Sequence, residues 1–91
     1  MLCARRYVVS GRVQGVGFRF FAQNAAAAEG LDGWVRNRPD GRVEIEAEGD
    51  AEAVERFERR IRMGPPASRV DDVQVDEMAP SGRRGAGFRA M

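Results

Sequence analysis

The sequence predicts an α+β sandwich, in which an antiparallel sheet carries two helices on one face. Apolar, strand-like runs alternate with helical segments in the order βαββαβ, and each helical segment has a single apolar stripe. One strand alternates between apolar and charged residues, as expected where one sheet face meets water. The chain has 91 residues and no repeat, low-complexity tract or linker, so we expect one domain over residues 1–91.

The first half of the chain reads as strand, loop, helix and strand. Arg6–Ser10 form the first predicted strand, and a glycine-rich loop follows it. One helical face carries Phe18, Phe21, Ala22, Ala25 and Ala26. Gly30 suits the position just after this helix, since glycine adopts the left-handed conformation that ends many helices. Leu31–Asn37 read as the second strand.

A tight turn and a third strand follow. Arg38-Pro39-Asp40-Gly41 predict the turn, because proline and glycine preset its dihedral angles. In the strand 42–48, three apolar side chains face one way (Val43, Ile45 and Ala47), and four charged ones face the other (Arg42, Glu44, Glu46 and Glu48). We expect the acidic row to be a solvated sheet face. Metal binding by these glutamates is the less favoured interpretation, because side chains along one strand diverge without a second element that supplies ligands.

The second helix has clear start and stop signals. Asp50 is the expected N-cap, and Met63-Gly64-Pro65-Pro66 end the helix. Its buried stripe consists of Val54, Phe57 and Ile61. We expect three i,i+4 ion pairs on its exposed side: Glu52–Arg56, Glu55–Arg59 and Glu58–Arg62.

The last third of the chain predicts a fourth strand and suggests a fifth. Val70, Val73 and Val75 mark the fourth strand, and Asp71-Asp72 interrupt its alternation, which indicates a β-bulge. Phe88 could anchor a short last strand after residues 82–87. We interpret Arg83-Arg84 as solvated loop charge.

Composition and charge exclude several classes of protein. No run of 18 apolar residues is present, and the apolar run after Arg5-Arg6 is too short for a signal peptide. A single cysteine, Cys3, allows no internal disulfide, so we expect a cytoplasmic protein. The net charge of +1 argues against nucleic-acid binding, since proteins that bind nucleic acids usually carry a clear basic excess.

The absence of histidine limits the available chemistry. It excludes Ser-His-Asp and Cys-His catalysis, phosphohistidine intermediates and the common zinc ligand sets. Cys3 is a poor candidate nucleophile, because we expect it in a frayed N-terminus far from the loop. Any catalysis must therefore use arginine, asparagine, carboxylates, backbone groups and water.

The loop Gly11–Arg19 is the strongest functional signal. A glycine-rich turn that enters a helix can direct several backbone N–H groups at one anion. Arg19 adds a planar guanidinium suited to two phosphate oxygens. A merely structural role for Arg19 is disfavoured, because a cation at a helix start is destabilising unless an anion joins it. For Gly15 and Gly17, tight-turn formation and amide presentation are compatible, and we expect Arg12 to be solvated or to brace the loop.

Two segments carry a resemblance to a known family. Val9–Arg19 resembles the first signature of the acylphosphatases. Gly33-Trp34-Val35-Arg36-Asn37, with Gly41 and Val43 following, resembles their second. The resemblance extends over nearly the whole chain. It implies a ferredoxin-like βαββαβ fold and hydrolysis of small acyl phosphates to a carboxylate and inorganic phosphate, without metal, cofactor or covalent intermediate.

The resemblance also assigns roles to individual residues. Arg19 matches the phosphate-binding arginine, and Asn37 matches an asparagine that orients the attacking water. The phosphate-binding loop corresponds to Gly15, Val16, Gly17, Phe18 and Arg19. Considered alone, Asn37 would be interpreted as a structural residue, because asparagine is common before turns. Its place in the second signature favours a catalytic role. Trp34 is expected to pack rather than to recognise substrate.

The chemistry agrees with this assignment. An acyl phosphate expels a carboxylate whose parent acid has a pKa of roughly 4, so no general acid is required. A phosphate monoester expels an alkoxide and normally needs an acid or a metal. A pocket without histidine therefore suits acyl phosphates better. We expect a monomer with an acyl phosphate substrate, inorganic phosphate as product and competitive inhibitor, and no nucleic-acid or membrane partner.

Two alternatives are kept. The first is a non-catalytic ferredoxin-like module that binds a phosphorylated ligand or partner, for which Asn37 would be unnecessary. The second follows from similar domains at the head of larger carbamoyl-transfer maturation proteins. A free-standing enzyme is the preferred interpretation, since the sequence stops at Met91.

Overall fold

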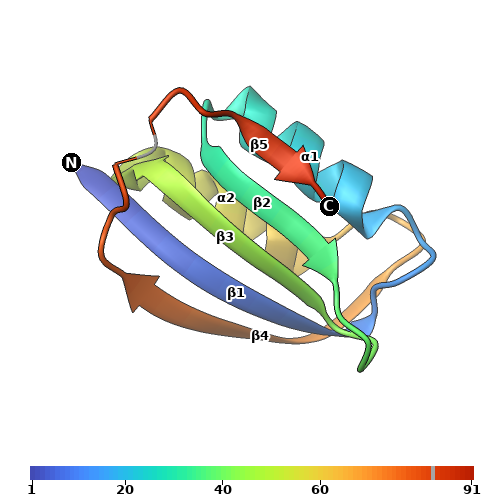
Figure 1. The fold of residues 1–91 in the computed structure, drawn as a ribbon. Coiled ribbons are helices and arrows are strands. Elements are labelled where there is room, and N and C mark those ends of the chain that lie inside the picture. The colour runs from blue at the N-terminus through green and yellow to red at the C-terminus, as the bar shows by residue number, and fades with distance from the viewer. Residues whose placement is uncertain (83) are drawn as a thin grey trace.

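The computed structural model describes residues 1–82 and 84–91, and it shows two helices covering one face of a sheet (Figure 1). The elements are β1 Leu2–Arg12, α1 Phe18–Ala28, β2 Asp32–Asn37, β3 Val43–Asp50, α2 Ala51–Met63, β4 Arg69–Met78 and β5 Phe88–Ala90. The predicted fold class is confirmed, and the strand suggested around Phe88 is present as β5. Among the residues that the structure describes, neither helix has the length and apolar character that a membrane span requires.

The strand order is β4-β1-β3-β2-β5. Neighbours from β4 to β2 run antiparallel, whereas β5 pairs with β2 in parallel. The predicted bulge is confirmed, because the β1–β4 register shifts between Ser10, opposite Asp72, and Gly11, opposite Val70. Asp71 is the extra residue in β4. The bulge lies where β1 leads toward the glycine loop.

The core lies between the sheet and the helices. Its largest fully buried side chains are Tyr7, Phe18, Phe57, Ile45, Ile61, Val9, Val13, Val35, Val43 and Val54. The predicted cap of α2 is confirmed, because the Asp50 carboxylate accepts a hydrogen bond of 3.2 Å from the backbone N–H of Glu52. Gly30, with φ of 68°, follows α1 as expected.

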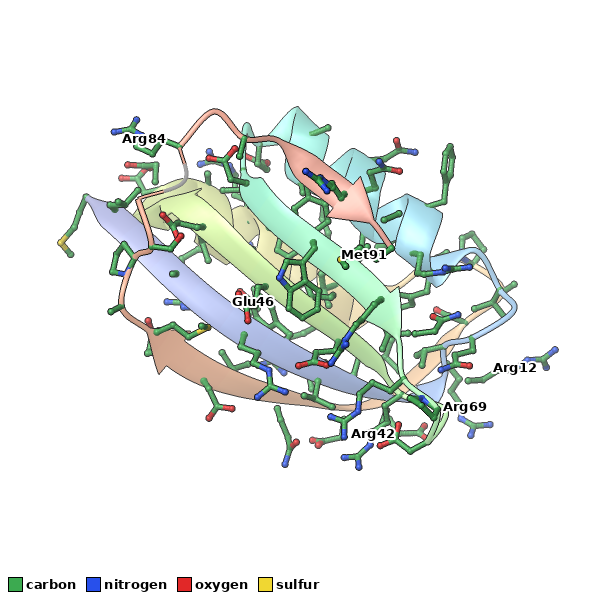
Figure 2. The ribbon with its side chains drawn as sticks, viewed as in Figure 1. Arg12, Arg42, Glu46, Arg69, Arg84 and Met91 are labelled. Carbon is green, nitrogen blue, oxygen red and sulfur yellow. The ribbon has the colours of Figure 1, made fainter. Side chains whose placement is uncertain are left out.

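Two of the glutamates expected on a solvated sheet face are buried, so that prediction was wrong for them. Glu44 and Glu48 do lie on the sheet face away from the helices, but they are only 3% and 2% exposed. Arg6 and Arg36 from the neighbouring strands cover Glu44, whose carboxylate accepts hydrogen bonds of 2.6 Å and 2.8 Å from them. Figure 2 shows Glu46 on this same face. Strand alternation predicted the face but not the side chains that cover it.

The segment after β4 covers Glu48 and is held by two buried carboxylates. The Glu48 carboxylate accepts hydrogen bonds from the backbone N–H groups of Ser81 and Gly82 and from the Ser81 hydroxyl, at 2.8–3.0 Å. The Asp32 carboxylate accepts from the backbone N–H groups of Gly85 and Gly87 at 3.1 and 2.8 Å. These bonds guide the chain across the sheet to β5. Arg83 lies outside the described residues, whereas Arg84 is exposed as expected (Figure 2).

The expected ion pairs along α2 form only in part. Glu58–Arg62 is present at 3.1 Å. Elsewhere the long side chains reach other elements: Arg56 pairs with Glu29, and Glu55 pairs with Arg5 of β1. The i,i+4 rule describes an isolated helix, and in this fold β1 and the end of α1 offer competing partners.

Trp34 packs, but not in the core. Its neighbour Val35 is fully buried on the helix side, so Trp34 projects from the other face of β2. There it is half-buried, and the Arg36 guanidinium lies 5.4 Å from the ring centroid. This distance is typical of a cation–π contact, which explains how the ring is held outside the core.

Glu44 and the two arginines that cover it, Arg6 and Arg36, form a cluster that predicts a loss of stability in acid. Burial raises the pKa of Glu44, but hydrogen bonds and charges from Arg36 and Arg6 outweigh it, so the pKa lies below its ordinary value. A carboxyl whose pKa is lowered by folding stabilises the protein above its unfolded pKa of about 4.3, and this stabilisation is lost as the pH falls further. We expect Glu44→Gln to cost about 1–2 kcal/mol at pH 7.

Chemical denaturation between pH 7 and pH 3 measures this effect. The unmodified protein should lose stability more steeply than Glu44→Gln below about pH 4.5, because it must protonate the paired carboxylate of Glu44 in addition to those that both proteins share. Equal slopes for the two proteins would show that the cluster does not couple folding to pH.

Candidate active site

The glycine loop connects β1 to α1 and shapes the start of that helix. Gly15 has φ of 73° and Gly17 has φ of 80°, both in the left-handed region that favours glycine. Gly17 is the N-cap of α1, and no side chain caps this helix end. The first turn of α1 contains no acidic residue. The positive end of the helix dipole therefore has no carboxylate from its own first turn beside it.

An open cavity of about 170 Å³ lies at this junction. Its lining residues are Val13, Gly15, Gly17, Phe18, Arg19, Phe20 and Asn37. Pockets for drug-sized ligands have volumes of roughly 300–1,000 Å³, so this cavity suits a smaller ligand. A Cβ atom built on Gly15 or Gly17 would have no neighbouring atom within 4 Å, which shows that the loop faces open space.

Arg19 occupies the first turn of α1 and lines the cavity. Its Nη1 donates a hydrogen bond of 2.8 Å to the main-chain oxygen of Met91. Figure 2 shows Met91 beyond the end of β5, next to the start of α1. One arm of the guanidinium is thus held by the residue that follows β5, and the side chain is exposed toward solvent.

Asn37 reaches the same cavity from β2, at the point where the β2–β3 hairpin begins. The hairpin turn is closed by two backbone hydrogen bonds, from Arg38 to Arg42 at 2.8 Å and from Gly41 to Arg38 at 3.1 Å. The Asp40 carboxylate accepts a further hydrogen bond of 3.0 Å from the backbone N–H of Arg42. These contacts restrict the backbone that carries Asn37.

Gln14 joins the loop to that hairpin. Its side-chain Nε2 donates to the main-chain oxygens of Arg38 and Arg42, at 2.7 and 2.9 Å. Both hydrogens of one amide are therefore used to hold two segments that lie more than 20 residues apart. This bridge places the residue before Gly15 next to the turn that follows Asn37.

The structure brings most of the expected site residues together. Arg19 and Asn37 line one cavity with three of the four other loop residues, namely Gly15, Gly17 and Phe18. Val16 does not line it, and its partly buried side chain packs against the core. Arg12 is exposed and points away from the molecule (Figure 2).

Cys3 does not lie in a frayed terminus, contrary to expectation. It belongs to β1 and pairs with Gly49 of β3. Burial raises the pKa of its thiol, an effect that the charge of Arg5 only partly opposes. The strand places Cys3 at the end of β1 opposite the loop, so the cysteine is remote from the cavity.

Four contributors were not among the expected site residues: Val13, Gln14, Phe20 and the Met91 main-chain oxygen. The bridge from Gln14 and the contact from Met91 depend on long-range packing, and no local pattern signals them. Phe20 could have been noticed, because it follows Arg19 directly and lies out of phase with the buried stripe of α1. Within the described ranges, no group of three or more Cys, Asp or Glu side chains is arranged to hold a metal ion.

The fold and this loop define a class: a ferredoxin-like α+β protein with a glycine loop and an arginine at the first strand–helix junction. The acylphosphatase family model matches residues 5–90. An acylphosphatase from Koribacter versatilis is 55% identical over 76 residues, which are 84% of this chain and 69% of that protein. The chain belongs to the acylphosphatase family and is an enzyme that hydrolyses acyl phosphates.

Solved structures agree with this membership. The crystal structure of acylphosphatase from Bacillus subtilis matches with a TM-score of 0.92 and 46% identity, covering 100% of this chain and 99% of that one. Full-length HypF, crystallised in a phosphate- and nucleotide-bound form, matches with a TM-score of 0.88 and 37% identity. The match covers 100% of this chain but only 12% of HypF.

Proposed function

We propose that the cavity at the β1–α1 junction is the catalytic site and that it hydrolyses acyl phosphates without a metal ion. The loop amides from Gly15 to Arg19 and the Arg19 guanidinium bind the phosphoryl oxygens. The side-chain oxygen of Asn37 accepts a hydrogen bond from the water that attacks phosphorus in line with the leaving carboxylate. The observation that carries the proposal is that Gly15 and Gly17 of the loop, Arg19 of α1 and Asn37 of β2 line one cavity.

The electrostatics of the loop favour an anion. The N-terminus of α1 carries partial positive charge, the glycines open the backbone toward the cavity, and Arg19 adds a full charge. The cation at this helix end is unfavourable by itself and becomes favourable when a phosphate joins it. The site therefore stabilises the ligand and the developing charge of a loose phosphoryl transition state.

The position of Asn37 in the cavity supports a catalytic role over a purely binding one. An amide oxygen can orient a water but adds little to the binding of a phosphate that Arg19 and backbone N–H groups already hold. The hairpin hydrogen bonds and the Gln14 bridge hold the backbone at Asn37 in a fixed position relative to the loop. Such positioning of two reactants converts an encounter into an oriented, effectively intramolecular step.

The leaving group explains why so few residues suffice. A carboxylate departs without protonation at neutral pH, so neither a general acid nor a histidine is needed. The water needs orientation more than deprotonation when the transition state is loose. The products are a free carboxylate and inorganic phosphate. We propose that inorganic phosphate inhibits competitively, because it binds to the same loop amides and to Arg19.

Resistance to chelation is the direct test of the proposed mechanism. We expect phosphate release from acetyl or benzoyl phosphate to continue unchanged in excess EDTA, because Arg19 supplies the charge that Mg²⁺ supplies at many phosphoryl-transfer sites. Release is measured colorimetrically with and without chelator after the protein has been dialysed against it. Activity that disappears with EDTA and returns with a divalent cation would contradict the proposed site.

We also propose that the enzyme acts as a monomer in the cytoplasm on a small-molecule substrate, without a nucleic-acid or membrane partner. The net charge of +1 argues against a nucleic-acid partner, and the small cavity supports a small-molecule substrate. Light scattering during size-exclusion chromatography tests the oligomeric state, and a dimer mass at working concentration would contradict it.

A further inference from the structure

The cavity has two chemically different sides. Its polar side consists of the loop backbone at Gly15 and Gly17 and the side chains of Arg19 and Asn37. Its apolar side consists of Val13, Phe18 and Phe20. Val13 and Phe18 are each only 1% exposed, whereas Phe20 is 67% exposed. Phe20 is therefore the apolar lining residue whose ring stands open to a ligand.

The position of Phe20 on α1 gives it access to the substrate. Successive residues of a helix project about 100° apart, so Arg19 and Phe20 flank the same cavity from neighbouring directions. A single exposed apolar side chain is common on protein surfaces and needs no explanation. Phe20 differs because it borders the cavity that also contains Arg19 and Asn37.

We infer that Phe20 is a specificity-determining residue that packs against the acyl group of the substrate and favours flat, apolar acyl groups over small ones. This inference rests on the proposed function, which assigns Arg19 and the loop amides to the phosphoryl end. Among the described residues that line the cavity, Arg19 and Asn37 carry the only polar side chains. Both are assigned to the phosphoryl group and the water, so contact with the acyl group falls to Phe20.

The chemistry of an aromatic acyl phosphate fits this surface. A benzoyl group is planar and conjugated with its carbonyl, so it can lie against a phenyl ring in an offset or edge-to-face arrangement. Contact would remove apolar surface of both rings from water. An acetyl group offers a single methyl group and gains little from the same ring. Since this contact is made equally before and during the chemical step, it should lower KM and leave kcat unchanged.

The test compares two substrates on four proteins: the unmodified enzyme, Phe20→Ala, Phe20→Leu and the control Met78→Ala. Met78 is also exposed and apolar, but β4 places it beside Ala4, at the end of the sheet opposite the loop. We expect Phe20→Ala to raise KM for benzoyl phosphate about 3- to 10-fold, with kcat changed less than about twofold. KM for acetyl phosphate and inhibition by inorganic phosphate should stay unchanged. Phe20→Leu should be intermediate, and Met78→Ala should behave like the unmodified enzyme.

The results of this experiment distinguish a failure of the Phe20 contact from a failure of the proposed function. If the unmodified enzyme hydrolyses both substrates and Phe20→Ala leaves the ratio of their kcat/KM values unchanged, the contact is refuted and the phosphoryl site stands. If phosphate inhibition weakens in parallel with both KM values, Phe20 supports the phosphate loop and the inference is overturned. If the unmodified enzyme releases phosphate from neither substrate, the proposed function fails and the contact fails with it. Phe20 is exposed and alanine favours helices, so the variant is expected to fold.

Discussion

Replacing Arg19 with alanine should lower kcat/KM for an acyl phosphate by between about 30-fold and several thousandfold. The side chain is proposed to make charge-assisted hydrogen bonds to two phosphoryl oxygens, which corresponds to roughly 2–5 kcal/mol. The loss should appear in both kcat and KM, because the guanidinium holds the phosphate in the ground state and stabilises charge in the transition state. Steady-state phosphate release gives both constants.

Two further variants make this result specific. Arg19→Lys should recover little activity, because an ammonium group lacks the planar fork that matches two oxygens. Arg12→Ala is the matched control: Arg12 is also exposed and stands at the end of β1 beside the same loop, but it does not line the cavity. A near-normal Arg19→Lys enzyme, or an Arg12→Ala enzyme as impaired as Arg19→Ala, would show that general positive charge rather than the Arg19 fork is what the site uses.

Asn37→Ala should abolish most turnover and leave phosphate binding intact. If Asn37 contacts the attacking water and not the phosphate, its removal raises only the barrier of the chemical step. Misplacing a reactant costs on the order of 100-fold, and we expect kcat to fall at least that far. Inorganic phosphate should inhibit with nearly unchanged affinity. It should also still raise the melting temperature of the variant, because a ligand that binds only the folded state stabilises it.

Calorimetry with inorganic phosphate and turnover with benzoyl phosphate, measured in parallel, decide this prediction. Asn24→Ala is the matched control, because Asn24 is exposed on α1 and lies outside the cavity. Loss of phosphate binding in Asn37→Ala as severe as in Arg19→Ala would make Asn37 a phosphate ligand or a brace of the loop. Full turnover in Asn37→Ala would refute the proposal that Asn37 positions the attacking water.

The element order could be predicted because it depends on local rules. Each of these rules involves residues that are close together in the sequence. Examples are the strand alternation in β3, the apolar stripe and Asp50 cap of α2, and the interruption at Asp71-Asp72. Errors at element ends were small where a cap or a turn was present. The first strand was predicted several residues too short, because pairing with β3 and β4 extends β1 to Leu2–Arg12.

The glycine loop and Arg19 could also be predicted from adjacent residues. Glycines that adopt positive φ directly before a helix start form an anion-binding turn, and all of these residues are neighbours in the sequence. Asn37 was harder, because a strand end followed by a turn commonly contains asparagine for structural reasons. The resemblance to the second signature, rather than the local pattern, singled it out. Its role as a catalytic residue stays a prediction.

Short-range periodicity and backbone conformation therefore made three features predictable: the layers, the glycine loop and the charge at the start of α1. The tertiary structure alone decided which strands became neighbours, and through them the burial of Glu44 under Arg6 and Arg36 and the bridge from Gln14 to the β2–β3 hairpin. It also decided that Phe20 and Asn37 share one cavity. Such contacts join residues far apart in the chain, and their energy depends on how the elements pack, which no local pattern encodes.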